Sequence, residues 1–235
     1  MIRAAIVTAG GVGTRMGCTM PKQYLGLNGI PILTRTLMAF ERHALIDFIV
    51  VTVPSGDEGF CMDGMVKPFN LNKVRTIVAG GRTRQESVYE GLKEARDSYL
   101  VAIHDGVRPL VSAETISKTF RAAESVGAAL ACGSIRETVK RKVGEMLETI
   151  PRSDMWLAHT PQTFHTDLIL KAHSKALEDR FEATDDAALV ERLGHPIEIV
   201  EDDDDNIKIT TPRDMELATM LLHRNSARDS GCSTP

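Results

Sequence analysis

The four cysteines of the sequence share no spacing that would place them in one site. Cys18, Cys61, Cys132 and Cys232 form no Cys-x-x-Cys pair. Zinc sites and the disulfide frameworks of small secreted proteins both rely on regularly spaced cysteines, so neither is expected. Isolated cysteines of this kind fit a reducing compartment.

Long apolar runs are also missing. No stretch of the sequence approaches the ~18 consecutive apolar residues of a membrane-spanning helix, so no membrane span is expected. The apolar run at the N-terminus is too short for a signal peptide and continues directly into a glycine-rich loop. We therefore expect a cytoplasmic location.

The chain has no excess of positive charge. Its 28 Lys and Arg residues are outnumbered by 32 Asp and Glu residues, which gives a formal net charge of −4. General affinity for nucleic acid or an anionic membrane is therefore not expected, and an anionic ligand would need a local cluster of cations. A length of 235 residues and a hydrophobic content of 43% are typical of one large globular domain.

The sequence does contain short apolar or β-branched runs that alternate with segments of helical period. The runs lack polar alternation, which is typical of strands buried on both faces of a parallel sheet. We predict an α/β fold, a three-layer α/β/α sandwich with a Rossmann-like, mostly parallel twisted sheet, in which ligands bind at the carboxyl ends of the strands. The predicted strands are 2–8, 48–53, 74–78, 99–104, 128–132, 160–164 and 197–200, and the predicted helices are 32–42, those that follow Thr83 and Ser112, 165–179, 185–193 and one from Pro212.

The segment 134–155 interrupts this alternation. Two charged, β-prone stretches flank Gly144, which favours a protruding two-stranded arm with a turn at the glycine over the alternative, an amphipathic helix broken there. Because an isolated hairpin is only marginally stable in water, we expect the arm to pack on a second subunit. We predict one domain over residues 1–224 that includes this arm, followed by a polar, disordered tail at 225–235.

A glycine-rich loop, Gly-Gly-Val-Gly at 10–13, follows the first predicted strand. Glycines allow backbone N–H groups to surround an anion, and the nearby cations Arg15 and Lys22 suit a triphosphate. The dinucleotide-binding and Walker patterns do not fit, because Met16 and Cys18 stand where those patterns require Gly and Lys. A plain glycine turn between a strand and a helix is the alternative interpretation.

Further motifs follow in order along the chain. After Gly-Gly-x-Gly-x-Arg-Met at 10–16 and Pro-Lys-Gln-Tyr-Leu at 21–25 come GGRTRQESV at 80–88, HDGVRP at 104–109, ETVK at 137–140, Arg152 with Trp156 and Thr-Pro-Gln at 160–162, TDDA at 184–187 and DNIKIT at 205–210. Together they resemble the motifs of nucleotidyltransferases, and in particular those of the 2-C-methyl-D-erythritol 4-phosphate cytidylyltransferase family of the non-mevalonate isoprenoid pathway. The resemblance covers about residues 2–222.

The resemblance implies an activity. An oxygen of a polyol phosphate would attack the α-phosphorus of CTP and release pyrophosphate. Two polyanions must then meet at bonding distance, so such a site needs cations around the α-phosphate. The resemblance further implies Mg²⁺ as cofactor and a homodimer formed through the arm, while the net charge and the short apolar runs predict no nucleic acid and no membrane as partner.

The resemblance also implies which residues form the site. The catalytic cations would be Arg15, Lys22 and Lys208. The nucleotide would be bound by Ala9, Gly10, Gly11, Gly13, Gly80, Gly81, Ser87 and Asp105. The acceptor would be bound by Arg108, Thr138, Arg152, Thr160 and Thr184, of which Thr138 and Arg152 would come from the partner. Mg²⁺ would be held by Asp105 and Asp205.

Several of these residues have structural alternatives. Asp105 could instead cap the next turn or pair with Arg108, and Thr184 could be a helix N-cap. The rest of the acidic run 201–205 is expected to be a solvated loop. Trp156 is expected in the core rather than at a ligand.

Two alternative functions remain open. Thr-Ala-Gly-Gly at 8–11 and HDGVRP lean towards a ribitol-5-phosphate cytidylyltransferase, whereas Trp156 and TDDAALVE at 184–191 favour the methylerythritol family. A non-catalytic nucleotide-binding module is the other alternative. The combination of Arg15, Lys22, Asp105 and Lys208 argues against it, since mere binding does not require cations around the α-phosphate.

Overall fold

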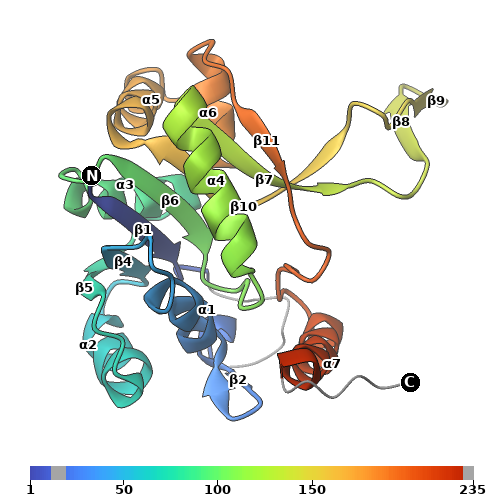
Figure 1. Cartoon of the computed structure of the whole chain (residues 1–235). Helices are drawn as coiled ribbons and strands as arrows, with labels where there is room; N and C mark the ends of the chain where they lie inside the picture. Colours follow the sequence, from blue (N-terminus) through green and yellow to red (C-terminus); the bar gives the residue numbers. More distant parts are fainter. Residues whose placement is uncertain (12–19, 230–235) are drawn as a thin grey trace.

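The computed structural model describes residues 1–11 and 20–229, the side chains of 226–229 excepted. Its described residues form a seven-stranded sheet in the order β11-β7-β10-β6-β1-β4-β5 (Figure 1). The strands are β1 (Arg3–Thr8), β4 (Phe48–Val53), β5 (Val74–Ala79), β6 (Leu100–Asp105), β7 (Ala128–Ser134), β10 (Trp156–His165) and β11 (Glu198–Glu201). A separate small hairpin consists of β2 (Gly26–Leu27) and β3 (Ile30–Pro31).

The sheet is mostly parallel, as predicted. β5, β4, β1 and β6 pair in parallel, and β11 pairs in parallel with β7. β10 is the exception, because it lies antiparallel between β6 and β7. The carboxyl ends of β1 and β6 therefore meet at the same edge of the sheet, where Thr8 lies opposite Asp105.

Helices cover both faces of the sheet, which confirms the three-layer sandwich. One face carries α1 (Ile32–Glu41), α4 (Ala113–Val126) and the helical turns α2 (Glu58–Cys61), η3 (Met62–Val66) and η4 (Lys67–Phe69), and the other carries α3 (Arg84–Glu94), α5 (Thr166–Glu178) and α6 (Asp186–Arg192). Along β1, Val7 packs with Phe40 and Phe120 on the first face, whereas Ile6 packs with Leu92 on the second. Both faces of the strand are thus apolar, because both are buried.

Side-chain caps explain where several helices begin. The hydroxyl oxygen of Ser112 accepts a hydrogen bond from the Thr115 amide at 3.0 Å, and Thr83 caps α3 in the same way. The last helix, α7 (Pro212–Asp229), begins after Thr211. It continues into the segment 225–235, in which we predicted a tail, since no Gly or Pro interrupts the helix before Gly231. The structure does not describe 230–235.

We expect Gly91→Ala to destabilise the fold by about 1–3 kcal/mol through overpacking. Gly91 lets α3 approach the sheet closely: a Cβ there would lie 2.7 Å from Cγ2 of Ile6 and 3.1 Å from Cγ2 of Thr52. Gly59→Ala on α2 is the matched control, because its Cβ would meet no atom within 4 Å. Urea unfolding of both variants tests this, and equal midpoints would contradict the packing argument.

The predicted arm is present. β8 (Val139–Val143) and β9 (Met146–Ile150) form an antiparallel pair that projects from the body, with Gly144 in the turn at a φ of 61° (Figure 1). Its apolar side chains face solvent in the single chain, and Met146 is 75% exposed. Trp156, expected in the core, is instead 39% exposed, because it pairs with Ser134 at the end of β10 that leads from the arm.

Among the described residues, no helix combines the length and the apolar character that crossing a bilayer requires. The described cysteines, Cys61 and Cys132, are free and buried. Cys18 and Cys232 lie outside the described residues.

Candidate functional site

A cavity of about 340 Å³ lies at the carboxyl ends of β1 and β6, at the edge of the sheet where ligands were predicted to bind. Its wall comes from the first loop, the 3-10 helix η2 (Lys22–Tyr24), the turn before α3, the end of β6 and the segment before α7. The predicted site residues that line it are Ala9, Gly10, Gly11, Lys22, Gly81, Ser87, Asp105 and Lys208. Arg15 and Gly13 lie outside the described residues.

The described start of the glycine loop is held by the protein's own hydrogen bonds. The amide of Ala9 donates to the Thr52 carbonyl at 2.7 Å, and Nε2 of Gln23 donates to the Ala9 carbonyl at 2.6 Å. Gln23 is buried beside Lys22 in η2. Gln23 therefore links the start of the glycine loop to η2, which carries Lys22. This link fixes the direction in which the loop backbone enters the cavity.

The turn at Gly80 and Gly81, before α3, has room only for glycine at both positions. A Cβ at Gly80 would lie 2.6 Å from Oγ of Ser87, and one at Gly81 would lie 2.2 Å from Cβ of Glu86. Oγ of Ser87 accepts from the Gly81 amide at 3.1 Å and donates to the Thr83 carbonyl at 2.8 Å. The Ser87 hydroxyl thus stabilises the turn, which brings the backbone to the wall of the cavity.

Asp105 lies at the centre of a cluster of cations. Its Oδ1 accepts from Nε of Arg84 at 3.2 Å, and its Oδ2 lies 2.9 Å from Nζ of Lys208 and 3.5 Å from Nε of Arg108. Burial alone would raise the pKa of Asp105, but the three cations outweigh it and hold that pKa well below its ordinary range. The carboxylate is therefore ionised, and the pairing with Arg108 considered as an alternative is present.

Thr160 lies beneath Asp105 rather than in the wall of the cavity. Its hydroxyl accepts from the Asp105 amide at 3.1 Å and lies 3.0 Å from Nδ1 of His104. Burial lowers the pKa of His104 to about 4, so the ring is neutral near pH 7. Since Nε2 of His104 faces the Arg108 carbonyl, which only accepts, we assign its proton to Nε2. The Thr160 hydroxyl therefore donates to Nδ1, and its hydrogen bonds are used inside the protein.

A second cavity of about 350 Å³ adjoins the first. Lys208 lines both cavities. The other residues that line the second are Arg108, Gly133, Ser134, Leu157, His159, Asp204, Asn206 and Ile207. Nη1 of Arg108 donates to the Asn206 carbonyl at 2.6 Å, so this buried arginine ties the end of β6 to the segment that carries Lys208.

Besides Thr160, three predicted acceptor-binding residues line neither cavity of the single chain. Thr138 and Arg152 are exposed at the base of the arm, where Arg152 donates to the Arg136 carbonyl. Thr184 is also exposed, and the N-cap of α6 is Asp185 instead, because its side chain accepts from the Ala188 amide at 3.0 Å.

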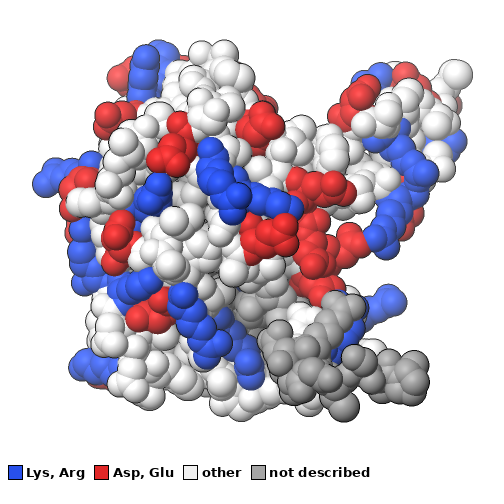
Figure 2. Space-filling model, viewed as in Figure 1, with Lys and Arg blue, Asp and Glu red and all other residues white. Residues whose placement is uncertain are grey.

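The two predicted metal ligands are not brought together. Asp105 is the only acidic residue among the described residues that line the first cavity, whereas Asp205 lines neither cavity and pairs with Arg224. In the described part of the chain, no three His, Cys, Asp or Glu residues are grouped as a metal site would require. Figure 2 shows acidic side chains gathered near the base of the arm, where Asp204 pairs with Arg136.

Two contributors to the site were not singled out from the sequence. Arg84 contacts Asp105 from α3, and its only signal was the arginine in the second glycine motif. Asp202, predicted as part of a solvated loop, is instead buried, where its carboxylate lies 3.0 Å from Nδ1 of His159 and accepts from Asn206 at 2.6 Å. Nothing in the acidic run distinguishes this residue from its exposed neighbours.

Two relatives of this chain and the sequence profile that matches it carry the same description. A sequence profile described as 2-C-methyl-D-erythritol 4-phosphate cytidylyltransferase matches residues 3–224. A protein of that name from Syntrophus aciditrophicus is 47% identical over 95% of this chain and 97% of its own length, and one from Clostridium novyi is 42% identical over 93% and 95%.

Solved structures agree. The 4-diphosphocytidyl-2C-methyl-D-erythritol synthase of Anaerococcus prevotii superposes with a TM-score of 0.84 at 33% identity, covering 94% of this chain and 96% of the other. The 2-C-methyl-D-erythritol 4-phosphate cytidylyltransferase of Thermus thermophilus does so with a TM-score of 0.76 at 35% identity, covering 94% and 98%.

Proposed function

The chain belongs to the 2-C-methyl-D-erythritol 4-phosphate cytidylyltransferase family, and we propose from the geometry of the two adjoining cavities lined by Lys208 how it performs that reaction. It is a nucleotidyltransferase that joins CTP and 2-C-methyl-D-erythritol 4-phosphate, releases pyrophosphate and forms 4-diphosphocytidyl-2-C-methyl-D-erythritol for isoprenoid synthesis. Residues 1–224 act as one catalytic domain in this proposal.

CTP occupies the first cavity. Gly10, Gly11 and Lys22 line this cavity and would bind the phosphates. Gly81 also lines it and, with the backbone of the neighbouring Gly80, would face the base. Arg15 would add a second cation at the phosphates. Its role follows from the sequence motif, and the described residues do not include it.

One observation carries the assignment: Lys208 stands between the two cavities. A nucleotide in the first cavity and an acceptor phosphate in the second would meet at its Nζ, which Asp105 holds at 2.9 Å. An acceptor oxygen then forms a bond to the α-phosphorus as the bond to the β-phosphate oxygen breaks. Lys208 and Lys22 stabilise the negative charge that develops on the α-phosphate oxygens.

The acceptor site is completed by a second copy of the chain. Arg108 lies at the second cavity, but Thr138 and Arg152 lie on the arm, outside it. The exposed apolar side chains Val143, Met146 and Leu147 give the arm a surface that a partner subunit would cover. We therefore include a homodimer in the proposal, with Thr138 and Arg152 acting in the partner's site and Thr184 contacting the polyol.

The first cavity offers one carboxylate ligand for Mg²⁺ among its described lining residues. This cation needs only one or two carboxylates when substrate phosphates and waters complete its coordination, and Asp105 offers one at the cavity wall. Bound there with CTP, the ion would neutralise phosphate charge. Asp205, paired with Arg224, offers no second ligand at this cavity. A cytoplasmic location is part of the same proposal, and it fits the free, buried cysteines of the described residues, Cys61 and Cys132.

Pyrophosphate release tests the acceptor assignment. With CTP and Mg²⁺, we expect release with 2-C-methyl-D-erythritol 4-phosphate and little with ribitol 5-phosphate, because the hydroxyl contacts of the acceptor site differ for the two polyols. Release with ribitol 5-phosphate alone would overturn the assigned acceptor. Tight CTP binding without release from either acceptor would instead favour a non-catalytic nucleotide-binding module.

A further inference from the structure

Arg84, the first residue of α3, joins two buried carboxylates. Its Nε donates to Oδ1 of Asp105 at 3.2 Å, and its Nη1 donates to Oδ2 of Asp186 at 2.7 Å. Asp105 belongs to the nucleotide cavity, whereas Asp186 begins α6. One guanidinium group therefore connects the reaction site to the start of α6.

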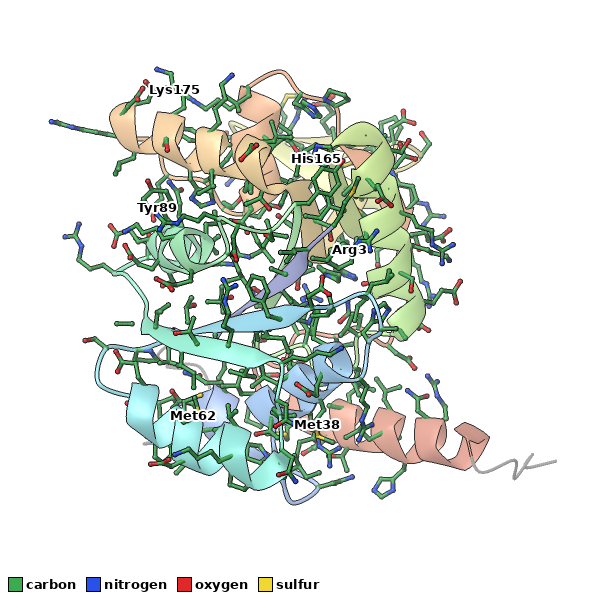
Figure 3. All side chains as sticks on the ribbon, turned by 60° about the vertical axis from the view of Figure 1, so that its left-hand side comes forward. Arg3, Met38, Met62, Tyr89, His165 and Lys175 are labelled. Atoms are coloured by element: carbon green, nitrogen blue, oxygen red, sulfur yellow. The ribbon has the colours of Figure 1, made fainter. Side chains whose placement is uncertain are left out.

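The Asp186 end of this contact is firmly anchored. Asp186 is only 1% exposed, and its amide donates to Oε1 of Gln162 at 3.1 Å. Its Oδ1 lies 3.3 Å from Nε2 of His173, a buried residue of α5. The His173 ring in turn stacks on Tyr89 of α3, with ring centroids 5.8 Å apart. Figure 3 shows the helices that carry Tyr89 and Lys175, α3 and α5, facing each other.

The Asp105 end is the one that needs an anchor. Its Oδ2 is shared by Lys208 and Arg108, and its Oδ1 is bonded by Arg84. Without Arg84, the longer Arg108 contact at 3.5 Å would be left to oppose rotation of the carboxylate about its Cβ–Cγ bond, a rotation that would carry Lys208 with it. The Lys208 side chain is 41% exposed, so burial does little to fix its ammonium group.

We propose that Arg84 is a positioning residue for the transfer reaction. By linking Asp105 to Asp186, it fixes the Asp105 carboxylate and, through it, holds the ammonium group of Lys208 at the α-phosphate. The inference rests on the proposed placement of the reaction at Lys208. The guanidinium reaches Asp105 and Asp186 through two separate nitrogens, Nε and Nη1, held in one plane, whereas a lysine would have to reach both carboxylates from a single Nζ.

Two variants and a matched control test the proposal. Arg84→Lys keeps the charge beside Asp105 but loses the bridge, and Asp186→Asn keeps the shape of the anchor but loses its charge. For each we expect kcat to fall by about 10- to 100-fold, as misplacement of a reacting group does, with the KM for CTP nearly unchanged. Arg192→Lys on α6, whose arginine pairs with Asp179 at the surface, should leave kcat unchanged.

Thermal unfolding and the double variant separate positioning from stability. If both substitutions break the same contact, Arg84→Lys/Asp186→Asn will be no slower than the slower single variant. Variants that unfold at lower temperature yet keep the kcat of Arg192→Lys would overturn the inference, since Arg84 would then be structural only. A wild-type protein that releases no pyrophosphate would overturn the proposed function itself, and the inference with it.

Discussion

Replacing Lys22 with alanine will lower kcat by about 100-fold or more, as removal of a single preorganised donor to a developing oxyanion does in other enzymes. Lys22 is buried in the wall of the first cavity, beside the start of the glycine loop. Because Lys22 is buried, water screens its positive charge little, and this charge interacts strongly with the negative charge that develops on the α-phosphate. The loss should fall on kcat at saturating CTP, measured by pyrophosphate release.

Lys118→Ala is the control for this experiment. Lys118 is an exposed lysine of α4 that pairs with Glu114 at 2.8 Å and lines neither cavity. Removing it changes the net charge of the protein by the same amount as removing Lys22. If the two variants turn over equally fast, the catalytic role assigned to Lys22 is wrong.

Mixing two inactive variants will restore about one quarter of the wild-type activity if the sites are shared across a dimer. Lys22→Ala damages the body of each site, and Arg152→Ala damages the arm that would serve the partner in the proposed dimer. Random exchange makes half of the dimers mixed. Each mixed dimer contains one site in which an intact Lys22 meets an intact Arg152 of the partner subunit, so a quarter of all sites are complete.

The position of Arg152 is the reason to expect this result. Its side chain is exposed, donates to the Arg136 carbonyl and lies outside both cavities of its own chain. Activity should be measured after the variants have exchanged subunits, with each variant alone as the control. A mixture that is no more active than the average of its components would show that each chain works with its own Arg152, or without it.

The sheet could be predicted well because its signals are local. β4 has the bounds predicted for 48–53, since the run FIVVTV is rich in β-branched residues and lacks polar alternation, as a strand buried along its whole length does. Gly144 likewise placed the turn of the arm. The helical turns at 58–69 were not predicted, because Gly59, Gly64 and Pro68 interrupt the helical period. They are stabilised by the burial of Cys61 and Met65 in the core, which only the tertiary structure reveals.

Only those site residues that belong to a local sequence motif could be predicted. Motifs at the ends of strands indicated Lys22, Asp105 and Lys208, and the structure brings these residues to one cavity. The pairing of Arg84 with Asp186 joins positions 102 residues apart, and no local pattern indicates it. The use of the Thr160 hydroxyl beneath Asp105 was missed for the same reason, since it depends on where β10 lies beside β6.

The place of β10 in the sheet has a consequence for how the chain matures on the ribosome. Residues 1–105 contain β1, β4, β5 and β6, which can pair as soon as they are synthesised. β10 ends only at His165, so until then the nascent chain presents β6 as an open strand edge, with β7 already made and unable to reach its place. Open edges invite pairing with other chains. Insertion of β10 therefore joins β7 to the rest of the sheet and covers the open edge of β6, before β11 adds to β7.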